Sequence, residues 1–377
     1  MKTKNNNYLN HSLILTLFLL LSSVKKSEQS KQIPALYVFG DSLVDSGNNH
    51  YLPGVDSAAN FFPYGIDFGT PTGRYTNGKT VADFLAIYLG LPFSPAYLGL
   101  SKSKANRIVT TGINYASAGS GILPDTNNKT VVLDEQIRGF ERTVKKILLK
   151  GLLSEDAVEK HVSESLFFVS SGVNDHFKRA TFRGSRKFAS YLIKEFKIRL
   201  LKLYSLGARK FLVNNVPPAG CFPSETLHSK PIGKCSEKIN KGISFYNKKL
   251  PFLLHELQTQ LPGFIFVHSD LNKSIMDIRE NPNKYGIVEV SKPCCPRNVN
   301  GNDTACHPYA DFCKNRDTYL FFDVHPTERA NQIYAIKCFI DHSICTPRIN
   351  IRHFFSTTSK YQALNQSYSV SVLNLGY

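Results

Sequence analysis

The sequence predicts an α/β fold in which helices cover both faces of a mainly parallel sheet. Two observations support this prediction. Short apolar runs bounded by turn residues recur along the chain, and stretches with apolar residues at helical spacing lie between them. Strands that alternate with amphipathic helices are typical of parallel sheets, because each helix carries the chain back across the sheet and packs on one face.

The predicted strands are five short apolar segments. They are Ile33–Phe39, Ile113–Ala116, Ser165–Val169, Lys210–Val213 and Phe264–Val267. The ligands of such sheets bind beyond the carboxyl ends of the strands. Ser42, Gly119 and Asn174 follow the first, second and third of these segments, so we expect their side chains and backbone to share one edge of the sheet.

The predicted helices are five stretches with apolar residues at helical spacing. In the first, Val81, Phe84 and Leu85 share one face. The stretches are Thr80–Leu89, Leu133–Leu149, Phe188–Leu203, Ile239–Leu257 and Pro326–Phe339. Pro326 suits the first turn of the last helix, where a missing N–H group costs nothing.

The N-terminal region has the pattern of a secretion signal. Lys2 and Lys4 precede an apolar run from Leu13 to Leu21, which small residues follow. The run is too short to cross a bilayer, and a membrane anchor or a buried helix is the alternative. We expect residues 1–30 to be a signal peptide, residues 31–351 to form the globular domain of an exported protein, and residues 352–377 to be a Ser-rich tail.

The eight cysteines all lie in the second half of the chain. An even number of cysteines in an exported protein indicates disulfides, and the adjacent Cys294 and Cys295 are poorly placed as two ligands of one zinc ion. We predict disulfides and no metal, and the sequence leaves the pairing open. Sugar acceptors of the form Asn-x-Ser/Thr stand at Asn128, Asn272, Asn302 and Asn365.

The net charge is +17 and the pI is about 9.4. No zinc-finger or RNA-binding signature accompanies this charge, so we expect no nucleic-acid partner for an exported protein. The charge indicates either a solvated basic surface or one that retains the protein on an acidic polysaccharide or an anionic lipid surface.

Four segments contain the residue types that acyl-transfer chemistry needs. Ser42 lies in the segment from Val38 to Asn49, at a predicted strand-to-helix turn whose N–H groups suit a developing oxyanion. Gly119 lies in Gly112–Ile122, where a residue without a side chain lets the backbone approach a substrate. Asn174 lies in Ser170–Asp175, and its amide can donate to the same oxyanion.

The fourth segment is Phe321–Asn331, with Asp323 just before His325 at a predicted helix start. A histidine can take the proton of a serine, and a carboxylate can fix the tautomer of that histidine. Each of the four segments has an ordinary structural explanation when it is taken alone. The order of serine, aspartate and histidine along one chain favours a catalytic triad.

Together these segments resemble the GDSL esterase/lipase family, in particular its plant branch within the SGNH hydrolases. The resemblance spans Ile33 to Ile351 and extends to Pro63–Asp67, Thr72–Gly78, Leu206–Lys210, Pro217–Cys221 and Cys294–Pro296. It implies a flavodoxin-like three-layer α/β/α sandwich with a mainly parallel five-stranded sheet. It also implies a secreted serine esterase or lipase in the cell wall or apoplast, acting on lipid or cell-wall acyl esters.

The resemblance assigns a role to each candidate residue. Ser42 would be the nucleophile, His325 the general base and then the general acid, and Asp323 the group that orients His325. The oxyanion hole would be the Ser42 N–H, the Gly119 N–H and the Asn174 side chain, with Gly112 as the alternative glycine. The reaction would pass through an acyl-enzyme and would need no metal or organic cofactor.

One departure from the family pattern affects the triad. The family spaces the last pair as Asp-x-x-His, whereas Asp323 and His325 are separated by Val324 alone. On a helix, one residue fewer rotates one side chain by about 100° relative to the other. Three outcomes follow: the local turn adjusts, Asp317 or another acceptor substitutes, or the pair is broken at a cost of about 10⁴ in rate.

Three alternatives to an ester hydrolase remain open at this point. The first is an acyltransferase, in which another alcohol replaces water at the same residues. The second is a secreted binding protein of the same fold that has lost efficient catalysis, which the short Asp323–His325 spacing supports. The third is a carbohydrate deacetylase of the cell wall, which fits the basic charge.

Overall fold

The computed structural model describes residues 33–54, 59–100, 109–178, 185–295, 306–308 and 310–346. These residues belong to a unit that spans Ile33–Phe355. The predicted signal peptide, the C-terminal tail, Asn302 and Asn365 lie outside the described residues.

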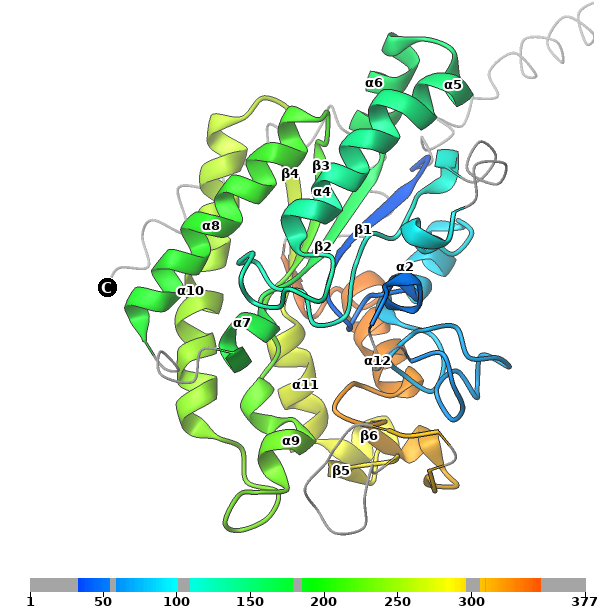
Figure 1. Ribbon diagram of the computed structural model, residues 1–377. Helices are drawn as coiled ribbons and strands as arrows, with labels where there is room; N and C mark the ends of the chain where they lie inside the picture. Colours follow the sequence, from blue (N-terminus) through cyan, green and yellow to red (C-terminus); the bar gives the residue numbers. More distant parts are fainter. Residues whose placement is uncertain are drawn as a thin grey trace, which may run out of the picture. The chain divides into compact units, whose positions relative to one another are not determined.

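A five-stranded sheet forms the centre of this unit (Figure 1). Its strands are β1 (Leu36–Gly40), β2 (Leu166–Ser170), β3 (Lys210–Asn214), β4 (Ile265–Ser269) and β7 (Cys345–Thr346). The first four are parallel and lie in chain order, and β7 pairs antiparallel with the edge of β4. The parallel strands are buried along nearly their whole length, because helices cover both faces. Four of the five predicted strands are confirmed.

The predicted strand Ile113–Ala116 is wrong, since this segment forms isolated bridges only. Asn114 pairs in parallel with Val38, and the Val38 N–H donates to Ile113 O at 3.0 Å. The segment therefore runs beside β1 in the position expected of a strand. On its other side it pairs only through a second isolated bridge, from Asn114 to Ala96, and Asn48 Nδ2 donates to the carbonyl oxygens of both Asn114 and Ala116.

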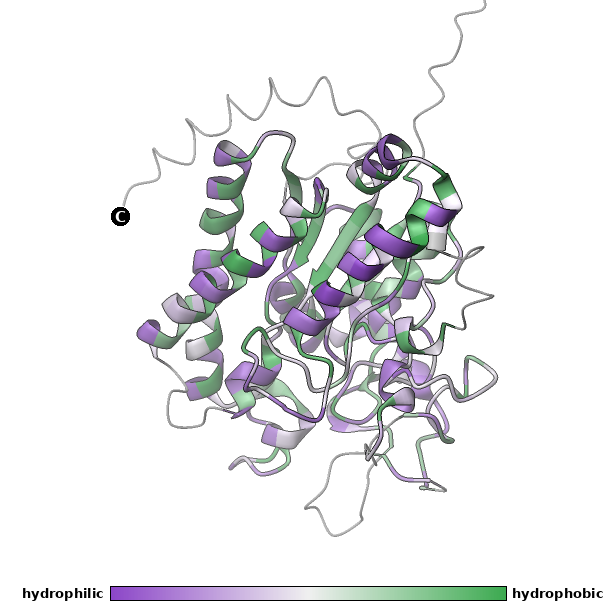
Figure 2. Cartoon of the chain, turned by 45° about the horizontal axis from the view of Figure 1, so that its top comes forward, coloured by the Kyte–Doolittle hydropathy of each residue, from purple (hydrophilic) through white to green (hydrophobic). Residues whose placement is uncertain are grey.

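Helices form a layer on each side of the sheet (Figure 1). On one side α4 (Leu133–Arg142), α8 (Arg186–Ser205) and α10 (Glu237–Gln260) pack side by side, and on the other α2 (Val81–Leu89), α11 (Leu271–Glu280) and α12 (Glu328–Phe339) do so. Figure 2 shows apolar strands at the centre and polar residues on the outer sides of the helices. The predicted three-layer fold is confirmed.

Two predicted helices differ in their bounds. The stretch Leu133–Leu149 is not one α-helix: α4 gives way to a π-helical turn, η4 (Thr143–Leu148), and then to α5 (Leu149–Leu152). At the change, the Thr143 hydroxyl donates to Gly139 O, a back-bond that loosens the helical ladder. The last helix begins at Glu328 and not at Pro326, because the side chain of Thr327 caps it by accepting from Ala330 N.

Several elements were not predicted, chiefly short ones. They are α6 (Glu155–Glu164), α7 (Val173–Lys178), α9 (Pro223–Thr226), α11, the short 3-10 turns, and the two-stranded sheet of β5 (Glu289–Pro293) and β6 (Tyr319–Phe321). The last of these matters for the site, since the chain leaves β6 directly into Phe322 and Asp323.

All eight cysteines form disulfides, which confirms the prediction of disulfides from the sequence. No cysteine is therefore left as a thiolate ligand for zinc. The pairs are Cys221–Cys235, Cys294–Cys313, Cys295–Cys306 and Cys338–Cys345. The second and third pack in one buried cluster with Tyr64 and Phe322. Across the described part of the chain, no helix combines the length and the apolar character that a bilayer span requires.

Candidate active site

Ser42 lies two residues beyond the end of β1. The sharp turn there depends on Gly40, because a Cβ atom at this position would lie 2.0 Å from the carbonyl oxygen of Ser170 on β2. The Asp45 N–H donates to Asp41 O at 3.0 Å and closes the turn. The predicted helix after Ser42 is wrong: a turn follows it, and the next regular element is the 3-10 turn η1 (Asn48–Tyr51).

His325 meets Ser42 across 283 positions of the sequence. Its Nε2 lies 2.8 Å from Ser42 Oγ, and its Nδ1 lies 2.9 Å from Asp323 Oδ1. Both distances are those of hydrogen bonds, so the three side chains form a continuous chain of contacts. Ser42 is only 8% exposed and Asp323 only 1%, which shields these contacts from water.

The short spacing of Asp323 and His325 leaves their contact intact. Both residues lie in a bend before α12, so the rotation that a helix would impose does not arise. Asp323 Oδ1 accepts from the backbone N–H of His325 at 2.8 Å as well as contacting its ring, which folds the turn around one carboxylate oxygen. Of the three outcomes that the sequence left open, the local turn adjusts; Asp317 is exposed.

Tyr64 is a site residue that the sequence did not predict. Its hydroxyl donates to the second oxygen of Asp323, Oδ2, at 2.5 Å. Burial raises the pKa of Tyr64 well above its ordinary value, and the charge of Asp323 adds to this, so the phenol stays protonated and acts as a donor. The buried carboxylate thus has a donor on each oxygen.

Three residues that line one cavity carry backbone or amide N–H groups. The N–H groups of Ser42 and Gly119 have no hydrogen-bond partner among the described residues, and Ser42, Gly119 and Asn174 line the same cavity. Asn174 Nδ2 donates one hydrogen to Ser120 O at 2.8 Å, which fixes the amide and leaves its second hydrogen for a ligand. Gly112, the alternative glycine, lies against the Leu36 backbone at the opposite end of β1.

Two buried carboxylates hold the segments that carry these donors. Asp45 accepts from the N–H groups of Gly47 and Asn48 through one oxygen and from that of Ala118 through the other. Burial raises the pKa of Asp45 to about 6, although these hydrogen bonds lower it. Asp175, beside Asn174, accepts from Ile122 N and Leu123 N in the same way. The Gly119 segment is therefore fixed from both sides.

The cavity next to Ser42 has a volume of about 600 Å³. Most of its wall is apolar, and Lys129 and Asn127 are polar residues on it. The apolar lining residues are Leu43, Tyr75, Ala118, Val173, Phe177, Phe222 and Val324. A mainly apolar pocket with a few convergent polar groups is typical of a site for a small organic ligand.

Comparison with known proteins identifies the family. The model of the GDSL-like Lipase/Acylhydrolase family matches residues 36–337. The chain belongs to the GDSL-like lipase/acylhydrolase family. The family prediction from the sequence is confirmed.

Three relatives from Arabidopsis thaliana illustrate how far the similarity extends. GDSL esterase/lipase At1g71691 is 39% identical over 338 residues, which cover 86% of each chain. GDSL esterase/lipase 7 is 37% identical over 348 residues, covering 87% of this chain and 94% of the relative. GDSL esterase/lipase At4g16230 is 38% identical over 339 residues, covering 85% and 91%.

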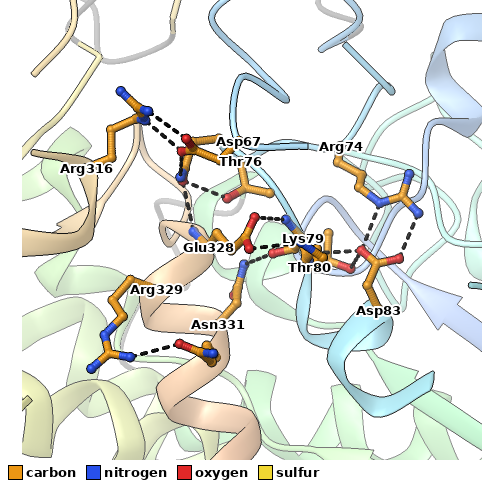
Figure 3. Close-up of polar contacts among 12 residues, drawn as sticks. Asp67, Arg74, Thr76, Lys79, Thr80, Asp83, Arg316, Glu328, Arg329 and Asn331 are labelled. Atoms are coloured by element: carbon orange, nitrogen blue, oxygen red, sulfur yellow. Dashed lines mark hydrogen bonds and ion pairs between the residues drawn. The ribbon is translucent and has the colours of Figure 1, made fainter. Parts of the chain in front are cut away.

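In this GDSL-family chain, a polar clamp joins a loop of the N-terminal third to the start of α12, which follows the turn with His325. Figure 3 shows the contacts of this loop with Glu328 and Asn331 of α12. The clamp consists of the loop from Asp67 to Thr80 and the start of α12. Thr76 Oγ1 donates to Pro326 O at 3.0 Å, and Lys79 N donates to Glu328 Oε2 at 2.8 Å. The segment Thr72–Gly78, one of those that resemble the family, falls in this loop.

Arg74 connects the clamp to the nucleophile turn. Its guanidinium makes two hydrogen bonds to Asp83, at 2.7 and 2.8 Å, and a third to Ser46 O at 3.3 Å (Figure 3 shows the Asp83 pair). A second bidentate pair joins Arg316 to Asp67 with both distances at 2.6 Å. Bidentate pairs fix geometry as well as charge, so the clamp holds the Ser42 and His325 segments in register.

The predicted sugar acceptors differ in accessibility where they are described. Asn128 is exposed on the loop between the cavity-lining residues Asn127 and Lys129. Asn272 is half-buried, and its amide donates to Val216 O at 3.1 Å. Asn128 therefore remains the better candidate for a glycan, and one attached there would stand beside the cavity.

Proposed function

We propose that this GDSL-family chain hydrolyses carboxylic esters through an acyl-enzyme on Ser42. Family membership gives the reaction class, an ester hydrolase acting on small-molecule esters. The observation that carries the finer proposal is the unbroken series of contacts from Ser42 Oγ through His325 to Asp323, at 2.8 and 2.9 Å. The same distances favour an active enzyme over an impaired binding protein.

The first step of the proposed reaction is acylation. Ser42 Oγ attacks the ester carbonyl carbon while His325 Nε2 takes the hydroxyl proton, and the imidazolium that forms is stabilised by the buried Asp323 carboxylate. The oxyanion accepts hydrogen bonds from Ser42 N, Gly119 N and Asn174 Nδ2. His325 then donates its proton to the leaving alcohol as the C–O bond breaks.

The second step is deacylation. Water attacks the acyl carbon, His325 takes its proton and returns it to Ser42 Oγ, and the acid is released. No residue in either step requires a metal or an organic cofactor. The apolar wall of the cavity suits a hydrocarbon part of the ester, and the size of about 600 Å³ admits a small lipid or acyl ester.

Covalent labelling tests the proposed nucleophile. A fluorophosphonate probe should label the purified protein at Ser42, and peptide mapping should locate the adduct. Ser42→Ala should abolish both labelling and turnover of a p-nitrophenyl ester. Ser46→Ala is the matched control, because Ser46 is equally buried and its hydroxyl has no partner among the described residues. Full activity in purified Ser42→Ala would refute the assignment.

Other acceptors and substrates are tested by product analysis. An acyltransferase would give a new ester when an acceptor alcohol is added, whereas a hydrolase would release only the free acid. A carbohydrate deacetylase would prefer acetylated sugars to longer acyl esters, which the apolar cavity wall does not favour. Secretion is part of the proposal and rests on the signal pattern at the N-terminus.

A further inference from the structure

The outer surface of α8 and α10 has a composition that the proposed reaction does not explain. We call it the α8–α10 face and define it by eight residues, four from each helix. They are Lys187, Tyr191, Lys194 and Ile198 on α8, and Lys241, Lys248, Lys249 and Phe252 on α10. On α8 these positions recur every three or four residues and form one stripe. On α10 Lys241, Lys248 and Phe252 form the stripe, and Lys249 lies beside it.

The two stripes lie next to each other. The helices run parallel, because Arg186 of α8 stacks over Phe245 of α10, and further along both helices Lys197 of α8 pairs with Glu256 of α10. Figure 1 and Figure 2 both show the two helices side by side at one edge of the unit. Position 186 faces 245 and position 197 faces 256, so Tyr191 and Phe252 are less than one turn apart along the helices.

Three apolar side chains on this face are exposed to solvent. Phe252 is 69% exposed, Ile198 55% and Tyr191 47%. Single exposed apolar residues are normal, but a group rimmed by polar residues marks a surface that binds a protein or a membrane. Burying such side chains in an apolar environment is favourable at roughly 25 cal/mol per Å².

The lysines of the face are not neutralised by any of the residues that the structure describes. Lys187, Lys194, Lys241, Lys248 and Lys249 are exposed and have no ion pair with any described residue. The acidic residues nearby are already paired, Glu195 with Arg199 and Glu256 with Lys197. The face therefore presents a concentrated positive charge around its apolar side chains.

We propose that the α8–α10 face binds an anionic lipid surface. Its lysines contact lipid headgroups, and Phe252, Ile198 and Tyr191 enter the interface between headgroups and acyl chains. An acidic polysaccharide would be attracted by the same lysines, but it offers no apolar phase for Ile198 and Phe252. The combination of exposed aliphatic and aromatic side chains with unpaired lysines therefore favours a lipid surface.

The α8–α10 face lies near the cavity, so binding of this face to a lipid surface also positions the cavity. Helix α10 packs against α7, and α7 contributes Val173, Asn174 and Phe177 to the cavity wall. A protein attached through this face would keep the cavity close to the surface. The attachment itself does not depend on the chemistry of Ser42, so the two proposals can fail separately.

Vesicle sedimentation tests the attachment. The probe is the full-length Ser42→Ala protein with vesicles of phosphatidylcholine alone or with about one quarter phosphatidylglycerol. We expect binding only to the anionic vesicles, and weaker binding at about 0.5 M than at about 0.1 M salt. Lys248→Glu with Lys249→Glu should weaken binding at least 30-fold, roughly the effect of two lysines. Phe252→Ser should weaken it several-fold at either salt concentration.

The control is Lys150→Glu with Lys160→Glu, which makes the same change of charge at exposed lysines of α5 and α6. This variant should bind within about twofold of the parent, since long-range attraction is screened beyond roughly 10 Å. If the control variant lost as much vesicle binding as the Lys248/Lys249 variant, net charge alone would explain the loss, and the proposal would be overturned. Binding to polygalacturonate but not to anionic vesicles would overturn it in favour of a polysaccharide. When the two double lysine variants are made in protein that retains Ser42, both should turn over a soluble ester at the wild-type rate. This result would separate attachment from catalysis.

Discussion

Asp41→Asn tests how burial affects the carboxylate next to the nucleophile. Asp41 is buried, and burial raises its pKa from 3.8 to about 7, although the Leu43 N–H and the nearby His325 lower it. One pKa unit corresponds to about 1.4 kcal/mol, so the rise is equivalent to about 4 kcal/mol. At a pH where the Asp41 carboxyl is charged in both the folded and the unfolded protein, the folded state is destabilised by this amount.

The sign of the effect follows from linkage. Because the folded pKa is raised, the folded protein holds its proton between pH 3.8 and 7, and the destabilisation grows as the pH rises through this window. Asparagine keeps the acceptor for Leu43 N–H, which lies 3.1 Å from Asp41 Oδ1, and carries no charge. We expect Asp41→Asn to raise the free energy of unfolding by about 2 to 4 kcal/mol at pH 8 and by little near pH 4.

The assay is urea unfolding of wild type and variant at several pH values between these limits, with disulfides intact. Asp277→Asn is a control of opposite sign. Burial would raise the pKa of Asp277, but hydrogen bonds from Lys337 and Tyr285 lower it to about 2, so this variant should be destabilised at pH 8 and converge with wild type as the pH falls towards 2. A difference between wild type and Asp41→Asn that does not change with pH would refute the reasoning.

Three further predictions concern catalysis. Tyr64→Phe removes one hydrogen-bond donor from Asp323. It should lower kcat and the rate of fluorophosphonate labelling about 10- to 100-fold with little change in KM, because the lost hydrogen bond is one to a charged group. The control is Tyr115→Phe, which loses a buried hydroxyl bond to Thr143 and should leave both rates unchanged. Inserting one alanine after Val324 restores the usual family spacing but should lower kcat/KM at least tenfold, because the present turn already aligns His325 with Ser42; a gain in rate would contradict the geometry. Asn174→Ala should lower kcat about 10²- to 10³-fold in steady-state assays, and an unchanged kcat would remove Asn174 from the oxyanion hole.

Local sequence patterns predicted the elements that have a clear apolar pattern, which is a short apolar run for a strand and apolar residues at helical spacing for a helix. The four parallel strands and the helices α2, α8, α10 and α12 have such patterns, and their bounds differ by a few residues at most. Strand β7 has only two residues, and its place at the sheet edge is set by its pairing with β4, so no local signal marks it. The segment Ile113–Ala116 has strand composition, but it pairs only through isolated bridges, and the Asn48 side chain occupies two of its carbonyl oxygens.

The candidate site was predictable where motif and chain order coincide, as at Ser42 and His325. The Asp323–His325 turn was not, because the expectation treated it as part of a helix that begins only at Glu328. Tyr64 carries no local signal of its role, since its partner Asp323 lies 259 residues away. Contacts of this kind arise from the tertiary fold and not from spacing.

The distance in sequence between Ser42 and His325 also affects when the site can form during synthesis. The four disulfides each close a loop of at most 19 residues, so none of them links the N-terminal segment with Ser42 to the C-terminal segment with His325. At roughly 5 to 20 residues per second, about 15 to 60 seconds separate the translation of the two residues. Throughout that interval Ser42 lacks the contact with His325 on which the proposed reaction depends. The proposed activity therefore requires that the segment with His325 has been made and has reached its contacts with the N-terminal loop.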